Sequence, residues 1–348
     1  MASIDKPAAK EISLSGMLPE EIGAVCNLPQ RFQAMQIFQW IARGCSSFED
    51  MTNLPLKERE RLAGEYTPRS TLCETVLKDP DGTVKLGIGL YDGSSIETVL
   101  LLDKHERKTA CVSCQVGCPM GCTFCQTGQL GCLRNLTSNE IVEQFLHLEK
   151  ICGKLDNIVF MGMGEPLLNL DSIAKTIAVL THPKGRNLSH RRITLSTSGI
   201  CKGIYELADR QLDIRLAVSL TTADEALRTT LMPVTKTNPL SELKKAIRYF
   251  NDKTDKRVTL ELALLKDVNT SYKAAQQVRT FAEGLNVHIN LIPWNPVQQL
   301  PYDIPSDSEI RSFYNYLTAE HLNVTVRQKR GRTIGGACGQ LGKKGRAE

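Results

Sequence analysis

The sequence lacks a long apolar segment, and this absence narrows the classes of protein that it can encode. None of its 348 residues belongs to a run approaching the ~20 consecutive apolar residues that span a bilayer. The N-terminal residues Met1 to Lys6 contain no apolar core of a signal peptide. Internal repeats and low-complexity segments are also absent. We therefore expect no membrane association and a location in the cytoplasm.

The excess of positive charge is small, whereas cysteine is plentiful. Lysine and arginine number 43 against 38 aspartate and glutamate residues, a net charge of +5, with a pI near 8.5. This charge is compatible with binding a polyanion but does not by itself indicate one. Six of the 12 cysteines lie between Cys111 and Cys132. Without a secretion signal, such clustering favours a metal, a cluster or thiol redox chemistry over a disulfide scaffold.

In the first third of the chain, a helical residue pattern is followed by a pattern of strands and turns. Ala34, Ile37, Phe38 and Ile41 follow helical spacing, which predicts a helix over 31–44, and a short second helix is expected over 56–62. From residue 70 to about 102 the pattern becomes strands and turns, with a strong turn signal at Asp79-Pro-Asp-Gly. We predict a helical accessory domain over 1–68, a β-rich connecting segment over 69–105, and a catalytic domain over 106–348.

Beyond residue 115, apolar strands alternate with amphipathic helices. Strands are expected over 157–161, 193–197, 214–220, 258–264, 287–292 and 324–328. A capping box from Thr137 to Glu140 predicts the start of one of the helices. This alternation indicates an α/β fold with a parallel sheet wrapped by helices. Periodicity leaves open whether the sheet is doubly wound or a closed or partial barrel.

Cys118, Cys122 and Cys125 form a C-x3-C-x2-C motif. Three thiolates this close in sequence can bind three irons of a 4Fe–4S cluster and leave the fourth iron without a protein ligand. That open iron can chelate the amino and carboxylate groups of S-adenosylmethionine (SAM). One electron passed into the complex can break a carbon–sulfur bond and produce a 5′-deoxyadenosyl radical. The motif therefore predicts a 4Fe–4S cluster and SAM as cofactors.

A structural zinc site is the competing interpretation of these cysteines. Cys111 with Cys114, and Cys122 with Cys125, are two C-x2-C pairs of the kind that zinc ribbons use. Only seven residues separate the pairs, fewer than the roughly fifteen to twenty usual in a ribbon. A ribbon would also leave Cys118 unused, so the spacing favours the cluster.

Several further motifs accompany the cysteines, in order, over roughly residues 20–342. They are Cys111-Val-Ser-Cys-Gln-Val-Gly-Cys118, Arg134–Thr137, Met161-Gly-Met-Gly-Glu165-Pro-Leu167, Arg191–Gly199, Leu291–Pro296 and Ala337–Leu341. Together they closely resemble the RlmN/Cfr family of radical SAM RNA methyltransferases. The resemblance implies a partial parallel (β/α) barrel of the radical SAM type with a small N-terminal helical domain that binds RNA. It also places the cluster loop at the C-terminal mouth of the barrel, after the first barrel strand.

The same resemblance implies a set of cofactor contacts. A carboxylate at the end of a strand, as at Glu165, can bind the methionyl ammonium of SAM, and glycines let the backbone approach it. Without the match, each position would be an ordinary turn residue. The implied cofactor-binding residues are Gly164, Glu165, Ser196, Ser219, Leu220, Thr221 and Asn295.

Two cysteines and a glutamate complete the chemistry that the resemblance implies. Carbon 2 of adenine is not nucleophilic, so direct displacement of a methyl group fails there. In the family, the cysteine matching Cys338 takes a methyl from one SAM molecule, and the radical from a second removes a hydrogen from that methyl. The methylene radical adds to adenine, and the cysteine matching Cys111 forms a disulfide that frees the product. Glu97 matches the proton acceptor.

The substrate implied is adenine in RNA. Pro166 and the Pro293-Trp294 pair resemble the branch that methylates carbon 2 of adenine in 23S ribosomal RNA and in transfer RNA. Two positions depart from the family: Thr221 stands where histidine is usual, and Met35 where lysine or arginine is usual. These departures make a paralogue with another RNA substrate an alternative. Methylation at carbon 8, as in the other branch of the family, is the alternative within the family. A non-catalytic, zinc-stabilised RNA-binding protein is the alternative from another class.

The expected partners follow from the same resemblance. They are RNA, a one-electron donor such as flavodoxin or ferredoxin, and a thiol reductant, with the protein acting as a monomer. Basic residues at the barrel mouth are candidate phosphate contacts. They are Arg134, Arg191, Arg192, Lys329, Arg330 and Arg332.

Overall fold

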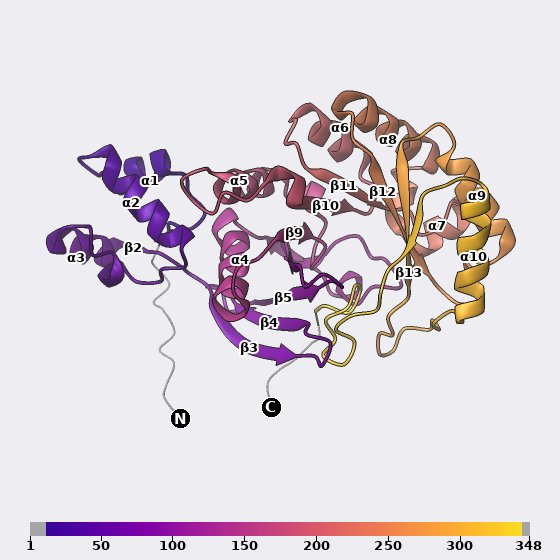
Figure 1. The fold of residues 1–348 in the computed structure, drawn as a ribbon, viewed down its shortest axis with the longest axis horizontal. Coiled ribbons are helices and arrows are strands. Elements are labelled where there is room, and N and C mark those ends of the chain that lie inside the picture. The colour runs from indigo at the N-terminus through magenta and orange to yellow at the C-terminus, as the bar shows by residue number, and fades with distance from the viewer. Residues whose placement is uncertain (1–11, 343–348) are drawn as a thin grey trace.

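The N-terminal region is a small group of helices set beside the main body of the protein (Figure 1). The computed structural model describes residues 12–342. This region comprises α1 (Pro19–Val25), α2 (Arg31–Ala42), a 3-10 helix (Phe48–Asp50), α3 (Leu56–Glu65), and the paired strands β1 (Ile12–Ser13) and β2 (Tyr66–Thr67). The predicted stripe on α2 is buried as expected. The helix ends at Ala42, two residues before Gly44, whose φ of +96° no helix accommodates.

The main body is built on a ten-stranded sheet. Its strands run in the spatial order β14-β13-β12-β11-β10-β9-β6-β5-β4-β3. They are β3 (Leu72–Lys78), β4 (Val84–Gly89), β5 (Ser95–Leu102), β6 (Lys108–Cys111), β9 (Asn157–Phe160), β10 (Ile193–Thr197), β11 (Arg215–Ser219), β12 (Val258–Leu264), β13 (Val287–Pro293) and β14 (Val324–Val326). Strands β3 to β6 pair antiparallel, and β6 to β14 pair parallel. The six strands predicted beyond residue 115 are confirmed.

Chain order and spatial order agree along the parallel part of the sheet. The connecting helices are α4 (Ser138–Cys152), α5 (Leu170–Thr181), α6 (Cys201–Asp209), α7 (Glu225–Leu231), α8 (Leu240–Thr254), α9 (Tyr272–Ala282) and α10 (Asp307–Ala319), with 3-10 turns at Thr127–Gln129, Pro166–Leu168, His190–Arg192 and Pro233–Lys236. A doubly wound sheet reverses its strand order, and this one does not. The sheet ends in two edges, β14 and β3, so the predicted partial barrel is confirmed. No helix between residues 12 and 342 is both long and apolar enough to cross a bilayer.

A buried carboxylate joins the N-terminal region to the barrel. Glu143, in α4, has no exposed surface. Its oxygens accept hydrogen bonds from the hydroxyls of Ser13 and Ser15, each at 2.7 Å, and from the backbone N–H groups of Ser70 at 3.0 Å and Thr71 at 2.7 Å. Ser13 and Ser15 lie near the N-terminal end, and Ser70 and Thr71 lie directly before β3. The Glu143 side chain therefore joins these two segments to α4.

Replacing Glu143 with alanine leaves these donors buried without an acceptor. We expect the free energy of unfolding to fall by about 3 kcal/mol, since each unsatisfied buried donor costs about 1–3 kcal/mol and some regain water. Urea denaturation followed by circular dichroism measures the change. Glu60→Ala, at an exposed position on α3, is the matched control with an expected change below about 0.5 kcal/mol. Equal stability of the two variants would contradict this role.

Candidate active site

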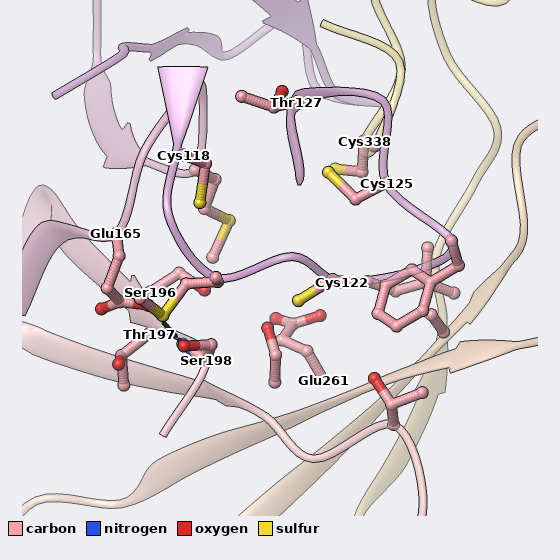
Figure 2. Close-up of a pocket in the computed structure, with 18 of the residues that line it drawn as sticks. Cys118, Cys122, Cys125, Thr127, Glu165, Ser196, Thr197, Ser198, Glu261 and Cys338 are labelled. Carbon is pink, nitrogen blue, oxygen red and sulfur yellow. Dashed lines mark hydrogen bonds between the residues drawn. The ribbon is translucent and has the colours of Figure 1, made fainter. Parts of the chain in front are cut away.

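The three cysteines of the C-x3-C-x2-C motif line one cavity at the C-terminal ends of the parallel strands (Figure 2). Cys118 is the last residue of β7 (Gln115–Cys118), which pairs with β8 (Gly131–Asn135), and Cys122 and Cys125 follow in the loop. The side chains surround a space and do not converge on a point: no three His, Cys, Asp or Glu residues within 12–342 are placed to hold a single ion. In a cubane cluster each thiolate binds a different iron, so the three thiols need not meet at a single ion.

The cluster loop is held by the barrel and not only by its own turns. The N–H of Thr123 donates to the carbonyl of Leu231 at 3.0 Å. The indole Nε1 of Trp294 donates to the carbonyl of Phe124 at 2.9 Å. Cys122 and Phe124 pack against a buried apolar cluster that includes Trp294, Leu231 and Met232. The loop therefore sits in an apolar, well-anchored environment that shields the cysteines.

Burial sets the protonation of the three thiols. It raises the pKa of Cys118 to about 12 and raises the pKa values of Cys122 and Cys125 as well. Such thiols stay neutral until a metal displaces their protons. Three thiols around one shielded cavity fit a 4Fe–4S cluster with one open iron, and Cys118, Cys122 and Cys125 would hold it.

Glu165 lies in the same cavity at the end of β9 and its turn. Only 2% of its surface is exposed, and burial raises the pKa of its carboxyl. One carboxylate oxygen accepts from the N–H and hydroxyl of Ser198, at 2.7 and 2.8 Å. The other accepts from the N–H of Leu167 at 3.1 Å. The carboxylate is thus fixed beside the cysteines (Figure 2), where it can meet a cationic group of a ligand.

Gly164 is required by the close approach of two loops. A Cβ atom there would lie 2.7 Å from the Cβ of Gln115 and 2.9 Å from the sulfur of Cys114, and its φ is +107°. The glycine lets the turn before Glu165 pack directly on the segment that leads to Cys118. Cys114 is therefore a buried packing residue of this wall.

The structure places most of the other predicted cofactor contacts on the same cavity. Ser196, Ser219, Thr221 and Asn295 line it, whereas Leu220 is buried and does not line it. Their contact with the cofactor stays a prediction.

Three charged residues of the site were not predicted from the sequence. Glu261, on β12, lines the cavity with 8% of its surface exposed, and burial raises its pKa. The occurrence of a glutamate within an otherwise apolar strand was the sequence pattern from which Glu261 could have been predicted as a site residue. Arg327 lines the cavity after β14. Arg228 is fully buried and donates to the carbonyls of Ser198 at 2.7 Å and Ser219 at 3.0 Å, so it ties two strand ends together; no sequence pattern marks it.

Thr221 occupies a strained backbone conformation. Its φ is +59°, a left-handed region that costs a non-glycine residue about 1–2 kcal/mol and that asparagine and histidine tolerate best. Two hydrogen bonds hold it there: its N–H donates to the carbonyl of Glu261 at 3.1 Å, and its carbonyl accepts from Asn269 at 2.9 Å. The conformation therefore suits the histidine that the family usually carries at this position better than threonine.

Thr221→Asn is expected to raise the free energy of unfolding by about 1 kcal/mol, because the strain is relieved while the backbone contacts remain. Urea denaturation of the two proteins measures the change. Thr222→Asn is the neighbouring control; its backbone has no positive φ, and no gain is expected. A loss of stability in Thr221→Asn would contradict the strain argument.

Cys338 stands between two cavities. It lines the cavity of the cluster cysteines, where it lies beside Cys125 (Figure 2), and also an adjoining cavity that Cys111 lines. Arg327 borders both cavities. Burial raises the pKa of Cys111 to about 12, and the Arg327 guanidinium acts against that rise. The structure thus brings together two cysteines that are far apart in sequence.

Glu97 lies apart from the lining of both cavities. Its carboxylate pairs with Lys85 at 2.8 Å and accepts from the N–H of Gly342 at 2.7 Å. The role of proton acceptor stays a prediction for this residue.

The residues of the predicted basic rim lie in different surroundings. Arg134 donates to Glu140 and Asp92, at 2.8 and 2.7 Å, so its charge is already paired within the protein. Lys329 and Arg330 line the adjoining cavity, together with Lys104 and Arg107, which the sequence did not single out. Arg191 and Arg192 are exposed, and Arg332 donates to Asn295 at 3.1 Å.

An open parallel barrel with a three-cysteine loop at its C-terminal mouth defines a radical SAM enzyme. Residues 112–275 match the family model of the Radical SAM superfamily, and residues 28–67 match that of the ribosomal RNA large subunit methyltransferase N-terminal domain. A radical SAM methyltransferase from Sphaerobacter thermophilus has the same fold, with a TM-score of 0.91 and 39% identity over 95% of this chain and 99% of that one.

The chain belongs to the RlmN family of radical SAM methyltransferases. It is 64% identical over 330 residues to a probable dual-specificity RNA methyltransferase RlmN of Treponema denticola, covering 95% of each chain. It is 58% identical over 331 residues to the protein of the same name in Treponema pallidum strain Nichols, covering 95% of this chain and 97% of the relative. The predicted family, fold class and cofactors, a 4Fe–4S cluster and SAM, are confirmed.

Proposed function

We propose that this enzyme methylates carbon 2 of adenine in 23S ribosomal RNA and in transfer RNA, with Cys338 as the methyl carrier. The observation that carries the proposal is the position of Cys338 on the border of two cavities, one lined by the cluster cysteines and one by Cys111. The names of the relatives, dual-specificity RNA methyltransferases, support RNA as the substrate.

The residues that line the two cavities have different roles in the proposed reaction. When bound, the 4Fe–4S cluster and SAM supply a methyl group and the 5′-deoxyadenosyl radical. Glu165 binds the methionyl ammonium with its fixed carboxylate, and Asn295, whose amide donates to the carbonyl of Cys338 at 3.2 Å, links the cofactor site to the carrier. Cys338 takes the methyl group and becomes the bridge to adenine. Cys111 attacks the sulfur of Cys338 and breaks its bond to the bridging carbon. The electron pair of that bond leaves on the carbon, which takes up a proton to become the methyl group of the product, and a Cys111–Cys338 disulfide remains.

The adjoining cavity is the proposed entrance for the target nucleotide. Lys104, Arg107, Lys329 and Arg330 line it, and cations at its rim would bind phosphates on either side of the target. The helical region over 1–68 would bind RNA beyond the barrel mouth, with 69–105 joining it to the catalytic region over 106–348. The enzyme would work as a monomer in the cytoplasm, with flavodoxin or ferredoxin as electron donor and a thiol that reduces the disulfide after each turnover.

Nucleoside analysis tests the substrate. The purified enzyme, with its cluster reconstituted, is incubated with unmodified 23S ribosomal RNA and transfer RNA, and the digested nucleosides are separated by mass spectrometry. We expect 2-methyladenosine in both RNAs. Only 8-methyladenosine would reject carbon 2. Methylation of neither RNA would indicate a paralogue, and Thr221 and Met35 are then the first positions to revert.

A further inference from the structure

The segment that carries Cys338 folds back across the barrel mouth and is held there mainly through its backbone. On the cluster side, its carbonyls accept from the N–H of Gln126 (Gly339, 2.8 Å) and from the hydroxyl of Thr127 (Leu341, 2.7 Å). These two contacts join the Cys338 segment to the cluster loop. They do not hold its beginning, at Gly335, or its end, at Gly342.

The first part of the C-terminal segment lies against the turn between β3 and β4 (Figure 1). Asp81 accepts from the N–H of Gly331 at 2.9 Å. Asp79 accepts from the N–H and hydroxyl of Thr333, at 3.1 and 2.6 Å. The antiparallel strands β3 to β5, which lie outside both matched family models, therefore serve as a support for the Cys338 segment.

An ion pair between a buried lysine and a partly buried glutamate on this support touches both ends of the segment. Lys85 on β4 and Glu97 on β5 pair at 2.8 Å, with 5% and 19% of their side chains exposed. The ammonium of Lys85 also donates to the carbonyl of Gly335 at 3.3 Å, and the carboxylate of Glu97 accepts from the N–H of Gly342 at 2.7 Å. One ion pair thus contacts the backbone on each side of Cys338.

The segment needs such contacts because its own sequence does not fix its shape. Gly335, Gly339 and Gly342 have φ values of +61°, +83° and +93°. Glycine reaches these values at little steric cost but loses the most conformational entropy when it is ordered. External hydrogen bonds must therefore determine the position of Cys338.

We propose that Lys85 and Glu97 are positioning residues that act as one unit, holding both ends of the segment Gly335–Gly342 and so keeping Cys338 at the border between the two cavities. The proposal depends on the proposed function only for the role of Cys338 as the methyl carrier. In this role Glu97 acts through the backbone of the segment. Removing either partner leaves the other buried without its counter-charge, so both ends of the segment are released together.

Hydrogen exchange of the whole, cluster-loaded protein without RNA tests the proposal. We expect Lys85→Met to speed the exchange of peptides covering 335–342 by about tenfold or more, because local opening controls exchange there. Glu97→Gln is expected to do the same. The double variant should exchange no faster than the faster single variant, since residues that act as one unit are not additive.

Two further variants separate positioning from general damage. Lys78→Met makes the same change at an exposed position on β3 and should exchange like the parent. Lys85→Arg keeps the charge and should restore slow exchange. The proposal is overturned if Lys85→Arg exchanges as fast as Lys85→Met, if the two single effects add, or if Lys85→Met leaves exchange of 335–342 unchanged.

A second readout separates this role from that of a proton acceptor. A displaced Cys338 wastes cofactor, so Lys85→Met should raise the 5′-deoxyadenosine formed per methylated RNA several-fold while iron content and SAM affinity stay at the parent level. If Glu97 served only as a proton acceptor, Lys85→Met would leave this ratio unchanged. The exchange experiment needs no turnover, so its result stands even if the RNA product differs from the one proposed.

Discussion

Replacing Cys118, Cys122 or Cys125 with alanine is expected to abolish cleavage of SAM to 5′-deoxyadenosine. Each thiol lines the cavity that the cofactors must occupy, and a cluster that loses one of three protein ligands is not retained in this site. Iron should fall from about four atoms per chain to less than one in the triple variant. Iron and acid-labile sulfide after anaerobic reconstitution, with product analysis by chromatography, measure both effects.

The fold of these variants should survive, because the loop is anchored by other groups. Trp294 and the backbone of Thr123 make the contacts that hold it, and deleting a single sulfur atom costs only about 1 kcal/mol. Cys132→Ala is the matched control: this cysteine lies on β8, a few residues beyond the motif, and is exposed. It should bind iron like the parent. A triple-alanine variant that keeps about four irons would refute the assignment of the ligands.

Sequence patterns located the parallel strands because these strands are rich in apolar residues, and parts of β11 and β12 are buried on both faces. Such strands read as nearly continuous apolar runs, and Leu216–Val218 and Leu260 are buried as that rule requires. The pair β7 and β8 gave no such signal. It is short, contains Gly117 and Gly131 with positive φ values, and its residues serve the cluster loop instead of a hydrophobic core.

Some residues of the site can be predicted from their neighbours in the sequence, and others only from contacts between distant segments. The cysteine motif is local, since its chemistry follows from spacing within eight residues. Glu261 and Arg327 become site residues only when separate strand ends meet. Lys85 shows most clearly what a sequence pattern cannot predict. A lysine in a strand normally faces solvent, but here the C-terminal segment, 250 residues away in sequence, covers it.

Cys338→Ala and Cys111→Ala are expected to fail at different steps. Cys338 is the only one of the two that lines the cofactor cavity, so without it no methyl group can be carried and neither methylated RNA nor an adduct should form. Cys111 is on β6 and lines only the adjoining cavity. Its removal leaves methyl transfer and bridge formation intact and blocks release. Product formation should fall by at least about a thousandfold in both variants.

The fate of the RNA distinguishes the two variants. Cys111→Ala should accumulate protein joined covalently to RNA, visible as a mobility shift on a denaturing gel that disappears after nuclease treatment. Cys338→Ala should show no shift. Cys152→Ala, at the end of α4 and away from both cavities, should turn over like the parent. Full turnover by Cys111→Ala, or an adduct with Cys338→Ala, would rule out these roles.

The same two cysteines predict how release depends on pH and on reductant. Burial raises the pKa of Cys111 to about 12, so at neutral pH only a small fraction is the attacking thiolate. Below that pKa the thiolate fraction grows about tenfold per pH unit, and decay of the adduct in the parent enzyme should accelerate accordingly as the pH is raised.

Each release oxidises Cys111 and Cys338 to a disulfide, so without a thiol reductant the enzyme should stop after about one turnover. Rapid quenching at several pH values, with adduct and product counted on the same gel, measures both; an adduct lifetime independent of pH would show that Cys111 is not the attacking group.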